Sequence, residues 1–439
     1  MFQFRKFISL TKSPIAKSVG IYTFSNFFAK GASFLLLIVF TNPLYILPSE
    51  NGLLSLFSNS MLFLMPFLSM GIIHSTSTDF FKLDKQAFSS FFTTGMIMPL
   101  AVMIISMTVF FFFREYIHSA YGFPYMFIWL IPLVTYFSFC NEQMLNLARN
   151  NNEPMTFLRA NIFKTVLELG LSFILVVGFF WRWEGRVAGI LISSAVIAIY
   201  AFYYFIKKGY LFGKIRKEYI INELIYAVPI IVLQAAIFAM NASDKFFLAH
   251  FTSDDNETVG IYSVACIFAS IVVLFSSALI QYVFPRIYAL LSAETINYPQ
   301  IRKYFLFYLG GMAVATVLII VITPLMYHFF INERYHAAIR YNYILCIGYF
   351  VWSVSYFFFS FLLYNKQKRK IFLFSLCCIA VSMICNYFFI RQGKDFGAAL
   401  SVATCFFIVL VLTLLFTKEY WQQFLFYRRN AGINQRSKI

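Results

Sequence analysis

The chain has 439 residues, of which 61% are apolar, 21% aromatic and 12% charged, with a mean hydropathy of +0.75 and a net charge of +17. A soluble domain of this composition would expose large apolar patches, which excludes the ordinary soluble classes. Apolar runs of about twenty residues recur along the whole length, and each can cross the ~30 Å hydrocarbon core of a bilayer. We therefore expect an all-α polytopic membrane protein.

The first apolar run follows a basic start, Met1 to Lys17, and extends to about Thr41. It is too long for the core of a signal peptide and ends without a small-residue cleavage pattern, so we expect a retained helix. Along the rest of the chain the runs predict twelve transmembrane helices in total. Their expected ranges are 16–41, 51–73, 89–113, 125–147, 157–180, 187–206, 224–250, 259–284, 304–330, 341–364, 371–390 and 397–417.

The basic residues predict the orientation of these helices. With a cytoplasmic N-terminus, the segments on that side carry 26 of the 35 Lys and Arg residues, and the opposite loops carry 7. The positive-inside rule then places both termini on the cytoplasmic side, which predicts a multi-pass protein of the inner (plasma) membrane. Topology and attraction to anionic lipid account for the net charge, so no nucleic-acid partner is expected.

Two pairs of glycines indicate an internal repeat. Gly52 and Gly260 follow similar turns 208 residues apart, and Gly189 and Gly397 precede the sixth and twelfth helices with the same spacing. Because each six-helix lobe has an even number of helices, both lobes would start on the same side of the membrane. The pseudo-two-fold axis would then run along the membrane normal, as in parallel repeats. The expected domains are an N-terminal lobe 1–206, a basic cytoplasmic linker 207–223, a C-terminal lobe 224–417 and a basic cytoplasmic tail 418–439.

No segment predicts an enzyme. Gly209 to Lys214 approaches a phosphate-loop pattern but is one residue short, and Ile215 replaces the Ser or Thr that would hold Mg²⁺. The five histidines have no metal-ligand spacing, and the seven cysteines lie within apolar runs without a paired CxxC arrangement. We therefore expect no catalytic residue, no metal and no cofactor.

Polar residues within the predicted helices are the candidate binding groups, because charges at membrane depth are costly and usually face a polar interior. Lys30 lies about 21 Å along the first helix at 1.5 Å per residue. Tyr22 and Asn26 share its helix face. On the seventh helix Gln234, Asn241 and Lys245 form a similar stripe, with Asp244 one turn from Asn241.

A second candidate group lies nearer the cytoplasmic end of the fourth and fifth helices. Glu142 and Arg149 are seven residues apart and share a face, while Glu168 follows Arg159 and Lys164. Two interpretations stay open for all these charges. They line a cavity for cargo, or they pair structurally and reach the interface with long side chains. The second interpretation suits Lys30 least, because its expected position is too deep for the side chain to reach the interface easily.

Short motifs resemble a known family. Asn241-x-x-Asp244-Lys245, an acidic turn and the run Val259 to Ala265 resemble the seventh-to-eighth helix signature of Wzx-type polysaccharide repeat-unit flippases. These are O-antigen and capsule exporters of the multidrug/oligosaccharidyl-lipid/polysaccharide (MOP) superfamily. Their first hairpin and the turn into their last helix are similar to Phe40-Thr41-Asn42, Glu50-Asn51-Gly52, Met70-Gly71-Ile72 and Gly397-Ala398-Ala399.

The resemblance implies a function in surface polysaccharide or lipopolysaccharide biosynthesis. Members move an undecaprenyl-diphosphate-linked oligosaccharide from the inner to the outer leaflet, and alternating access of two lobes is the expected mechanism. Lys30 and Lys245 would supply cations for the diphosphate. The implied partners are this lipid-linked substrate, membrane lipid and a polysaccharide polymerase or assembly protein.

Three alternatives compete with this interpretation. A cation-coupled multidrug exporter of the same superfamily would carry a carboxylate in the first helix, where this chain has Lys30 and no acid. A membrane glycosyltransferase, polymerase or ligase would need a long outer loop, which the predicted topology lacks. A membrane scaffold without transport would leave the intramembrane charges unexplained.

Overall fold

The computed structural model describes residues 14–254, 256–293 and 295–425, and every regular element in that part is a helix. The chain divides into two compact units. Unit 1 takes in the residues up to Phe238 together with Lys245–Ser263 and Phe330–Tyr335. Unit 2 takes in Ala239–Asp244, Val264–Phe329 and the residues from His336 onward.

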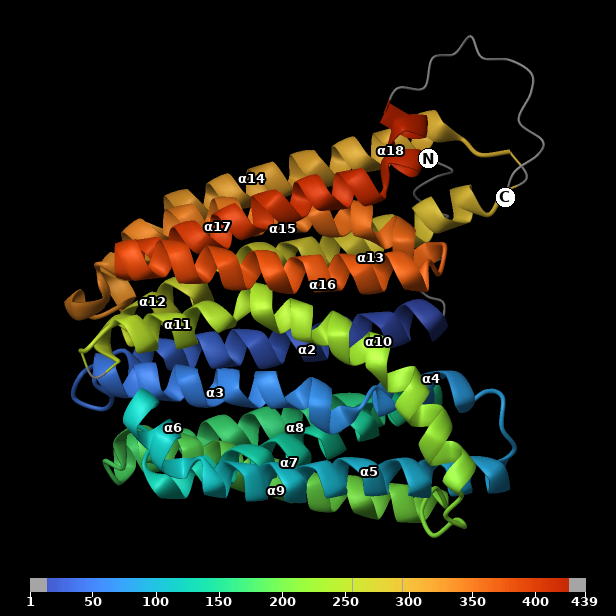
Figure 1. Cartoon of the computed structure of the whole chain (residues 1–439), viewed down its shortest axis with the longest axis horizontal. Coiled ribbons are helices and arrows are strands. Elements are labelled where there is room, and N and C mark those ends of the chain that lie inside the picture. Colours follow the sequence, from blue (N-terminus) through green and yellow to red (C-terminus); the bar gives the residue numbers. More distant parts are fainter. Residues whose placement is uncertain (1–13, 255, 294, 426–439) are drawn as a thin grey trace. The chain divides into compact units, whose positions relative to one another are not determined.

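Unit 1 is a bundle of long apolar helices in which α7 packs against both α8 and α9, and α2 packs along α8 (Figure 1). Its elements, of which α10, α11 and α12 also contribute residues to unit 2, are α2 (Pro14–Phe40), α3 (Pro48–Ser69), α4 (Ile72–Asp79), α5 (Lys85–Phe112), α6 (Arg114–Tyr121), α7 (Tyr125–Asn150), α8 (Pro154–Phe173), the π-helical turn η1 (Ile174–Gly178), α9 (Arg182–Lys208), α10 (Lys217–Asn241), α11 (Ser243–Phe251), α12 (Glu257–Ala269) and the short 3-10 turn η2 (Glu333–Tyr335).

Unit 2 is built around α17, which packs along both α15 and α16 (Figure 1). Besides its share of α10, α11 and α12, its elements are α13 (Ile271–Leu291), α14 (Tyr298–Phe330), α15 (Ala338–Tyr364), α16 (Lys368–Cys385), the π-helical turn η3 (Asn386–Ile390), α17 (Arg391–Phe416) and α18 (Lys418–Leu425). The expected helices 371–390 and 397–417 are separate limbs that meet at Lys394, whose φ of 45° and ψ of −119° are not helical.

The described helices make the chain an all-α multi-pass membrane protein. Eight helical stretches in this part are long and apolar enough to cross a bilayer, and ten if each of two bent pairs counts as one span. The bent pairs are α6 with α7, at 104°, and the two limbs of α10, at 42°. A shorter apolar helix, Phe27–Phe40, belongs to α2. The number twelve stays a prediction.

Two of the expected helices are interrupted. The expected helix 51–73 ends at Ser69, because Met70 and Gly71 both adopt left-handed backbone conformations with φ of 46° and 70° before α4 begins. The expected helix 224–250 is split at Ala242 into α10 and α11. The length of an apolar run does not by itself reveal such breaks, because the run continues past them.

Within unit 1 the start of α12 crosses the start of α3 at two of the glycines that predict the repeat. A Cβ atom on Gly260 would lie 1.8 Å from the Pro48 carbonyl oxygen, and one on Gly52 would lie 2.1 Å from the Asn256 carbonyl oxygen. The hydroxyl of Ser263 donates to that of Ser55 at 2.6 Å, with 208 residues between them. A shift of 208 residues takes Pro48 to Asn256 and Gly52 to Gly260, so the two glycine contacts are equivalent to each other. This pattern is expected where equivalent segments meet on a local two-fold axis.

This crossing predicts a steric requirement for glycine at position 260. Gly260→Ala should lower the free energy of unfolding by about 3 kcal/mol, because backbone cannot yield as a flexible side chain does. Gly170→Ala is the matched control, since nothing lies within 4 Å of the added methyl. The measurement is the apparent unfolding temperature of the purified protein. Equal temperatures for the two variants would contradict the close crossing.

Residues 209–216, within the expected linker 207–223, lie against α5 in unit 1. The backbone N–H groups of Gly213 and Arg216 donate to the hydroxyls of Thr93 and Thr94 at 3.0 and 3.2 Å. A Cβ atom on Gly213 would lie 2.4 Å from the Ser89 carbonyl carbon. This stretch of the chain therefore follows the surface of the bundle closely.

Side chains on both sides of that loop reinforce the attachment. The Tyr210 ring packs edge-on against Phe88 at 5.2 Å between centroids, and its hydroxyl donates to the Asn151 amide oxygen at 3.0 Å. Burial raises the pKa of Tyr210, so the donating hydroxyl stays protonated at neutral pH. Further along, the buried Glu223 carboxylate accepts a hydrogen bond from Ser75 at 2.7 Å.

The docked loop should resist proteolysis. Gly213→Ala would push the loop off α5 and should raise the rate of tryptic cleavage at Lys214 and Arg216 about tenfold, because losing one or two hydrogen bonds raises the open population by that order. Gly310→Ala, which has nothing within 4 Å of its added methyl, is the control. Unchanged cleavage of the Gly213→Ala protein would show that the loop is not held there.

Candidate functional site

Lys30, the candidate cation predicted to lie deepest in the membrane, is on α2. Its side chain is exposed, and it forms no ion pair within the described part of the chain. α2 is fixed along α8 by Asn161, whose amide nitrogen donates to the carbonyl and hydroxyl oxygens of Ser25 at 3.2 and 2.9 Å. The side chains of Tyr22 and Asn26, predicted to share the Lys30 face, lie outside the described residues.

Asp244 and Lys245 lie in the first turn of α11, just after the helix break, and both are buried, with 2% and 6% of their surface exposed. In unit 1 the Lys245 ammonium is 5.8 Å from the centroid of the buried Tyr262 ring, within cation–π range. In unit 2 Asp244 lies within electrostatic range of Tyr349 and Cys405. The interior of each unit therefore holds one member of the pair.

The break before this pair is surrounded by hydroxyl and amide groups of unit 2. The carbonyl oxygen of Ala239 accepts hydrogen bonds from the hydroxyls of Ser243 and Ser382, each at 2.5 Å. The Asn386 amide donates to Ser243 at 2.8 Å and accepts from Ser401 at 2.6 Å. A carbonyl freed from a helix at membrane depth needs such partners.

Two other predicted residues lie on α10. Asn241 is its last residue, directly before the break. The Gln234 amide nitrogen is 3.4 Å from Nε2 of His74 on α4, at the edge of hydrogen-bond range. Since His74 follows the left-handed turn at Gly71, this contact joins α10 to the first hairpin of unit 1.

Glu142 and Arg149 form an exposed polar strip on α7, whose residues between them are buried. Neither makes an ion pair within the described residues, although the Arg149 guanidinium lies 5.8 Å from the centroid of the Phe157 ring. Both side chains are therefore available to an external partner, one as an acceptor and one as a donor.

Glu168 has a different environment. Its carboxylate forms an ion pair with Arg186 at 2.8 Å, and the same guanidinium donates to the Ser172 hydroxyl at 2.8 Å. The backbones are close here, because a Cβ atom on Gly189 would lie 2.3 Å from that hydroxyl. Of the two interpretations of Glu168, the structural one has a named partner, which is neither Arg159 nor Lys164.

Comparison with known proteins now gives the family. A family model described as "Polysaccharide biosynthesis protein" matches residues 15–291, which is more than half of the chain. The chain belongs to this polysaccharide biosynthesis family. No curated protein matches it significantly.

Solved structures show which folds this family member resembles. The lipid II flippase MurJ, in an inward closed conformation, is similar with a TM-score of 0.71 and 13% identity, over 90% of this chain and 87% of that one. An inward-facing multidrug resistance MATE family transporter of the MOP superfamily has a TM-score of 0.65 and 11% identity, over 89% and 95% of the two chains. At these identities the likeness establishes the fold, which is that of MOP superfamily transporters.

Sequence reasoning missed the polar groups around the helix break in this polysaccharide biosynthesis family member. Ser382 and Asn386 are four residues apart within the apolar run 371–390, so they share a helix face, and this polar face could have indicated them. It also missed Arg186, which precedes the expected helix 187–206 and lies within α9. Among the described residues, no group of three or more His, Cys, Asp or Glu side chains could hold a metal ion.

The Glu168–Arg186 pair should behave as a structural unit. Removing either charge leaves a half-buried partner without its counter-ion, so Glu168→Gln and Arg186→Met should each destabilise the protein. The double variant should recover about 1 to 3 kcal/mol relative to the sum of the two single effects. Apparent unfolding temperatures of the three variants complete the cycle. Additive effects would show that the two side chains are not coupled.

Proposed function

We propose that this protein is a flippase that moves a polyprenyl-diphosphate-linked oligosaccharide repeat unit from the cytoplasmic to the outer leaflet by alternating access. The observation that supports this most directly is that Lys30, which the sequence predicts to lie deep in the membrane, has no ion-pair partner in the described structure. A cationic group in that position suits a diphosphate, which needs counter-charges during its passage.

Family and fold support the same conclusion. The family is one of polysaccharide biosynthesis proteins, and the fold is shared with a protein named as a lipid II flippase. Movement of a diphosphate out of a negative-inside cell is favoured by about 2.3 kcal/mol per charge per 100 mV, so an ATP-hydrolysing domain is not required in principle. The exported unit would serve O-antigen or capsule assembly at the inner membrane, with both termini in the cytoplasm and a polymerase or assembly protein as partner.

A multidrug exporter is the second candidate, because a MATE family transporter shares the fold. Cationic drugs need a carboxylate, and α2 contains no Asp or Glu between Pro14 and Phe40. Lys30 on this helix would repel such cargo. The charge of α2 therefore favours an anionic cargo.

Deletion of the gene from its native cell tests the proposal. The surface polysaccharide should be lost, and its lipid-linked repeat unit should accumulate in the inner leaflet, as measured by extraction and mass spectrometry of polyprenyl-linked sugars. Normal surface polysaccharide without that accumulation would contradict the proposed flippase function. Increased drug sensitivity in its place would favour the exporter.

The role of Lys30 has its own test in the deletion strain. Lys30→Ala should reduce export about tenfold or more, as expected from loss of one charge-assisted hydrogen bond, without loss of protein from the membrane. Lys30→Arg should retain most activity because it keeps the charge. Lys303→Ala, at an exposed lysine of α14, is the matched control. Export by Lys30→Ala at the level of the control would remove Lys30 from the site.

A further inference from the structure

The docked loop, residues 209–216 between α9 and α10, presents two large apolar side chains to its surroundings. Phe212 is 82% exposed and Ile215 is 64% exposed. Phe212 also has a φ of 68°, a left-handed backbone conformation that costs a side chain of this size about 1 to 2 kcal/mol. Packing within the described structure offsets little of that cost, since most of the ring has no protein against it.

The loop is held on both sides of Phe212. The buried Tyr210 before it is fixed by its ring contact with Phe88, and the Gly213 N–H after it donates to Thr93 at 3.0 Å. Because these attachments fix the backbone, the Phe212 ring keeps its outward position. The exposure of this ring is therefore a property of the fold and not of a loosely attached loop.

The loop meets α5 at the beginning of the membrane span that the sequence predicts for residues 89–113. Its contacts are with Ser89, Thr93 and Thr94, which lie about 6 to 14 Å along α5 at 1.5 Å per residue. Figure 1 shows the connection from α9 to α10 at the end of unit 1 where α5 begins. Phe212 and Ile215 are therefore expected at the level of the membrane interface.

The exposed side of α5 beyond this contact has the composition of a lipid-facing surface. Its exposed side chains are apolar except for Thr108, whose hydroxyl donates to the Ile104 carbonyl oxygen of the same helix at 3.0 Å. Polar groups of a membrane protein gather around its cavities, so an apolar face of this kind is expected to contact acyl chains. The apolar residues include Ile97, Leu100, Ile104, Ile105, Val109 and Phe112.

The same stretch of chain is strongly basic. From Lys207 to Lys217 it contains five basic residues and no acid. Lys208 forms an ion pair with a glutamate between α7 and α8. Lys214, Arg216 and Lys217 are exposed, and they form no ion pair within the described residues. These three cations alternate with the two apolar side chains, so the loop can contact charged and apolar groups together.

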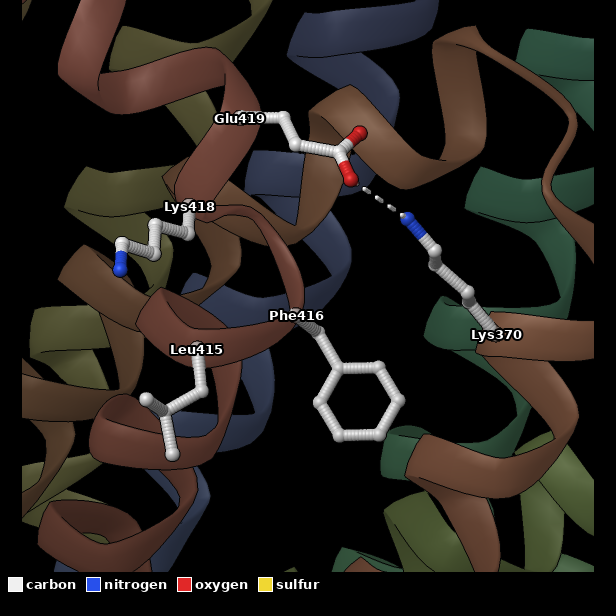
Figure 2. Close-up of a pocket in the computed structure, with 5 residues that line it drawn as sticks. All are labelled: Lys370, Leu415, Phe416, Lys418 and Glu419. Carbon is white, nitrogen blue, oxygen red and sulfur yellow. Dashed lines mark ion pairs between the residues drawn. The ribbon is translucent and has the colours of Figure 1, made fainter.

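A second basic stretch, Lys368 to Lys370 at the start of α16 in unit 2, lacks this combination. There Lys370 has an acid beside it, since it pairs with Glu419 at 3.7 Å, and Lys418 points away from that pair (Figure 2). The turn before the stretch, residues 365–367, is polar. It therefore provides a matched comparison, with the same charge and without an apolar turn that could insert into lipid.

We propose that the docked loop anchors unit 1 to anionic phospholipid of the cytoplasmic leaflet. Phe212 and Ile215 insert between the acyl chains, and Lys214, Arg216 and Lys217 contact the headgroup phosphates. Each basic residue near an anionic leaflet adds about 1 kcal/mol, and an apolar group with a polybasic segment supplies the two signals that stable attachment needs. A soluble acidic protein would satisfy only the cations. The anchor requires no cargo, so it is independent of the proposed flippase function.

The test measures where residue 212 lies relative to the bilayer. Full-length Phe212→Cys carries a nitroxide in vesicles of phosphatidylcholine, with or without phosphatidylglycerol. The background is Cys377→Ser, because the other six cysteines are buried. Collisions of the nitroxide with O₂, which concentrates in the bilayer, are compared with its collisions with a water-soluble Ni²⁺ chelate. Lys366→Cys, at the exposed turn before α16, is the reference for a label in water.

Two sets of charge removals test the role of the lipid headgroups. The loop variant is Lys214→Gln/Arg216→Gln/Lys217→Gln. The matched control, Lys368→Gln/Arg369→Gln/Lys370→Gln, also removes two lysines and one arginine, but from the start of α16. The label stays at residue 212 in both.

In vesicles with phosphatidylglycerol, the ratio of O₂ to chelate collisions should be at least about fivefold higher at residue 212 than at residue 366. That factor corresponds to one basic residue near an anionic leaflet. The ratio should fall by a similar factor in phosphatidylcholine alone and in the loop variant, but not in the control. The dependence on phosphatidylglycerol is measured on the unsubstituted loop, so it does not require the variant to fold.

Three results would overturn the proposal. The chelate would reach residue 212 as readily as residue 366 if the loop lies in water. Protection from both reagents would indicate a protein partner or a second copy of the chain. A ratio that depends neither on phosphatidylglycerol nor on the three cations would show that anionic lipid is not recognised.

Discussion

The constraint on which this structure depends is that a backbone carbonyl or N–H group inside a bilayer must find its partner within the protein. Long unbroken helices meet that constraint by themselves, but this chain interrupts its helices at several points. Between α10 and α11 the cost is met by the hydroxyls of Ser243 and Ser382, which share the carbonyl of Ala239. At the break between α3 and α4 the backbone supplies the partner itself, since the Met70 N–H donates to the Pro66 carbonyl oxygen at 3.2 Å. Breaks therefore occur where a partner for the freed backbone group is at hand.

Close backbone approach is the second consequence of folding in lipid. Without a hydrophobic drive between helices, association depends on contact and on interhelical hydrogen bonds, and small residues allow both. Gly189 allows α9 to reach Ser172, and this approach brings Arg186 to Glu168. Gly52 and Gly260 allow α3 and α12 to cross, and Ser55 meets Ser263 one turn further on. Steric room thus decides which polar groups become partners.

The membrane class and the unusual residues could be predicted from the sequence, because both depend on local quantities. Hydropathy is read along the chain, and a charge such as Lys30 or Asp244 is conspicuous against it. Partners could not be predicted in the same way. Glu168 shares its helix with Arg159 and Lys164, whereas its partner Arg186 lies on α9, beyond the π-helical turn η1. Docking of residues 209–216 on α5 likewise depends on backbone contacts at Gly213 that leave no hydropathy signal.

The pairing of charges separates structural groups from candidates for cargo. In unit 1 Glu50 pairs with Arg182, Glu153 with Lys208, and Glu168 with Arg186, so each acid is neutralised where it lies. Lys30 differs, because the described structure offers it no such partner although the sequence predicts that it lies deep in the membrane. A lysine at that depth is costly unless water or an anion reaches it. An anionic cargo passing α2 would offset that cost while it is bound, so an unpaired lysine on this helix suits the transport of an anion.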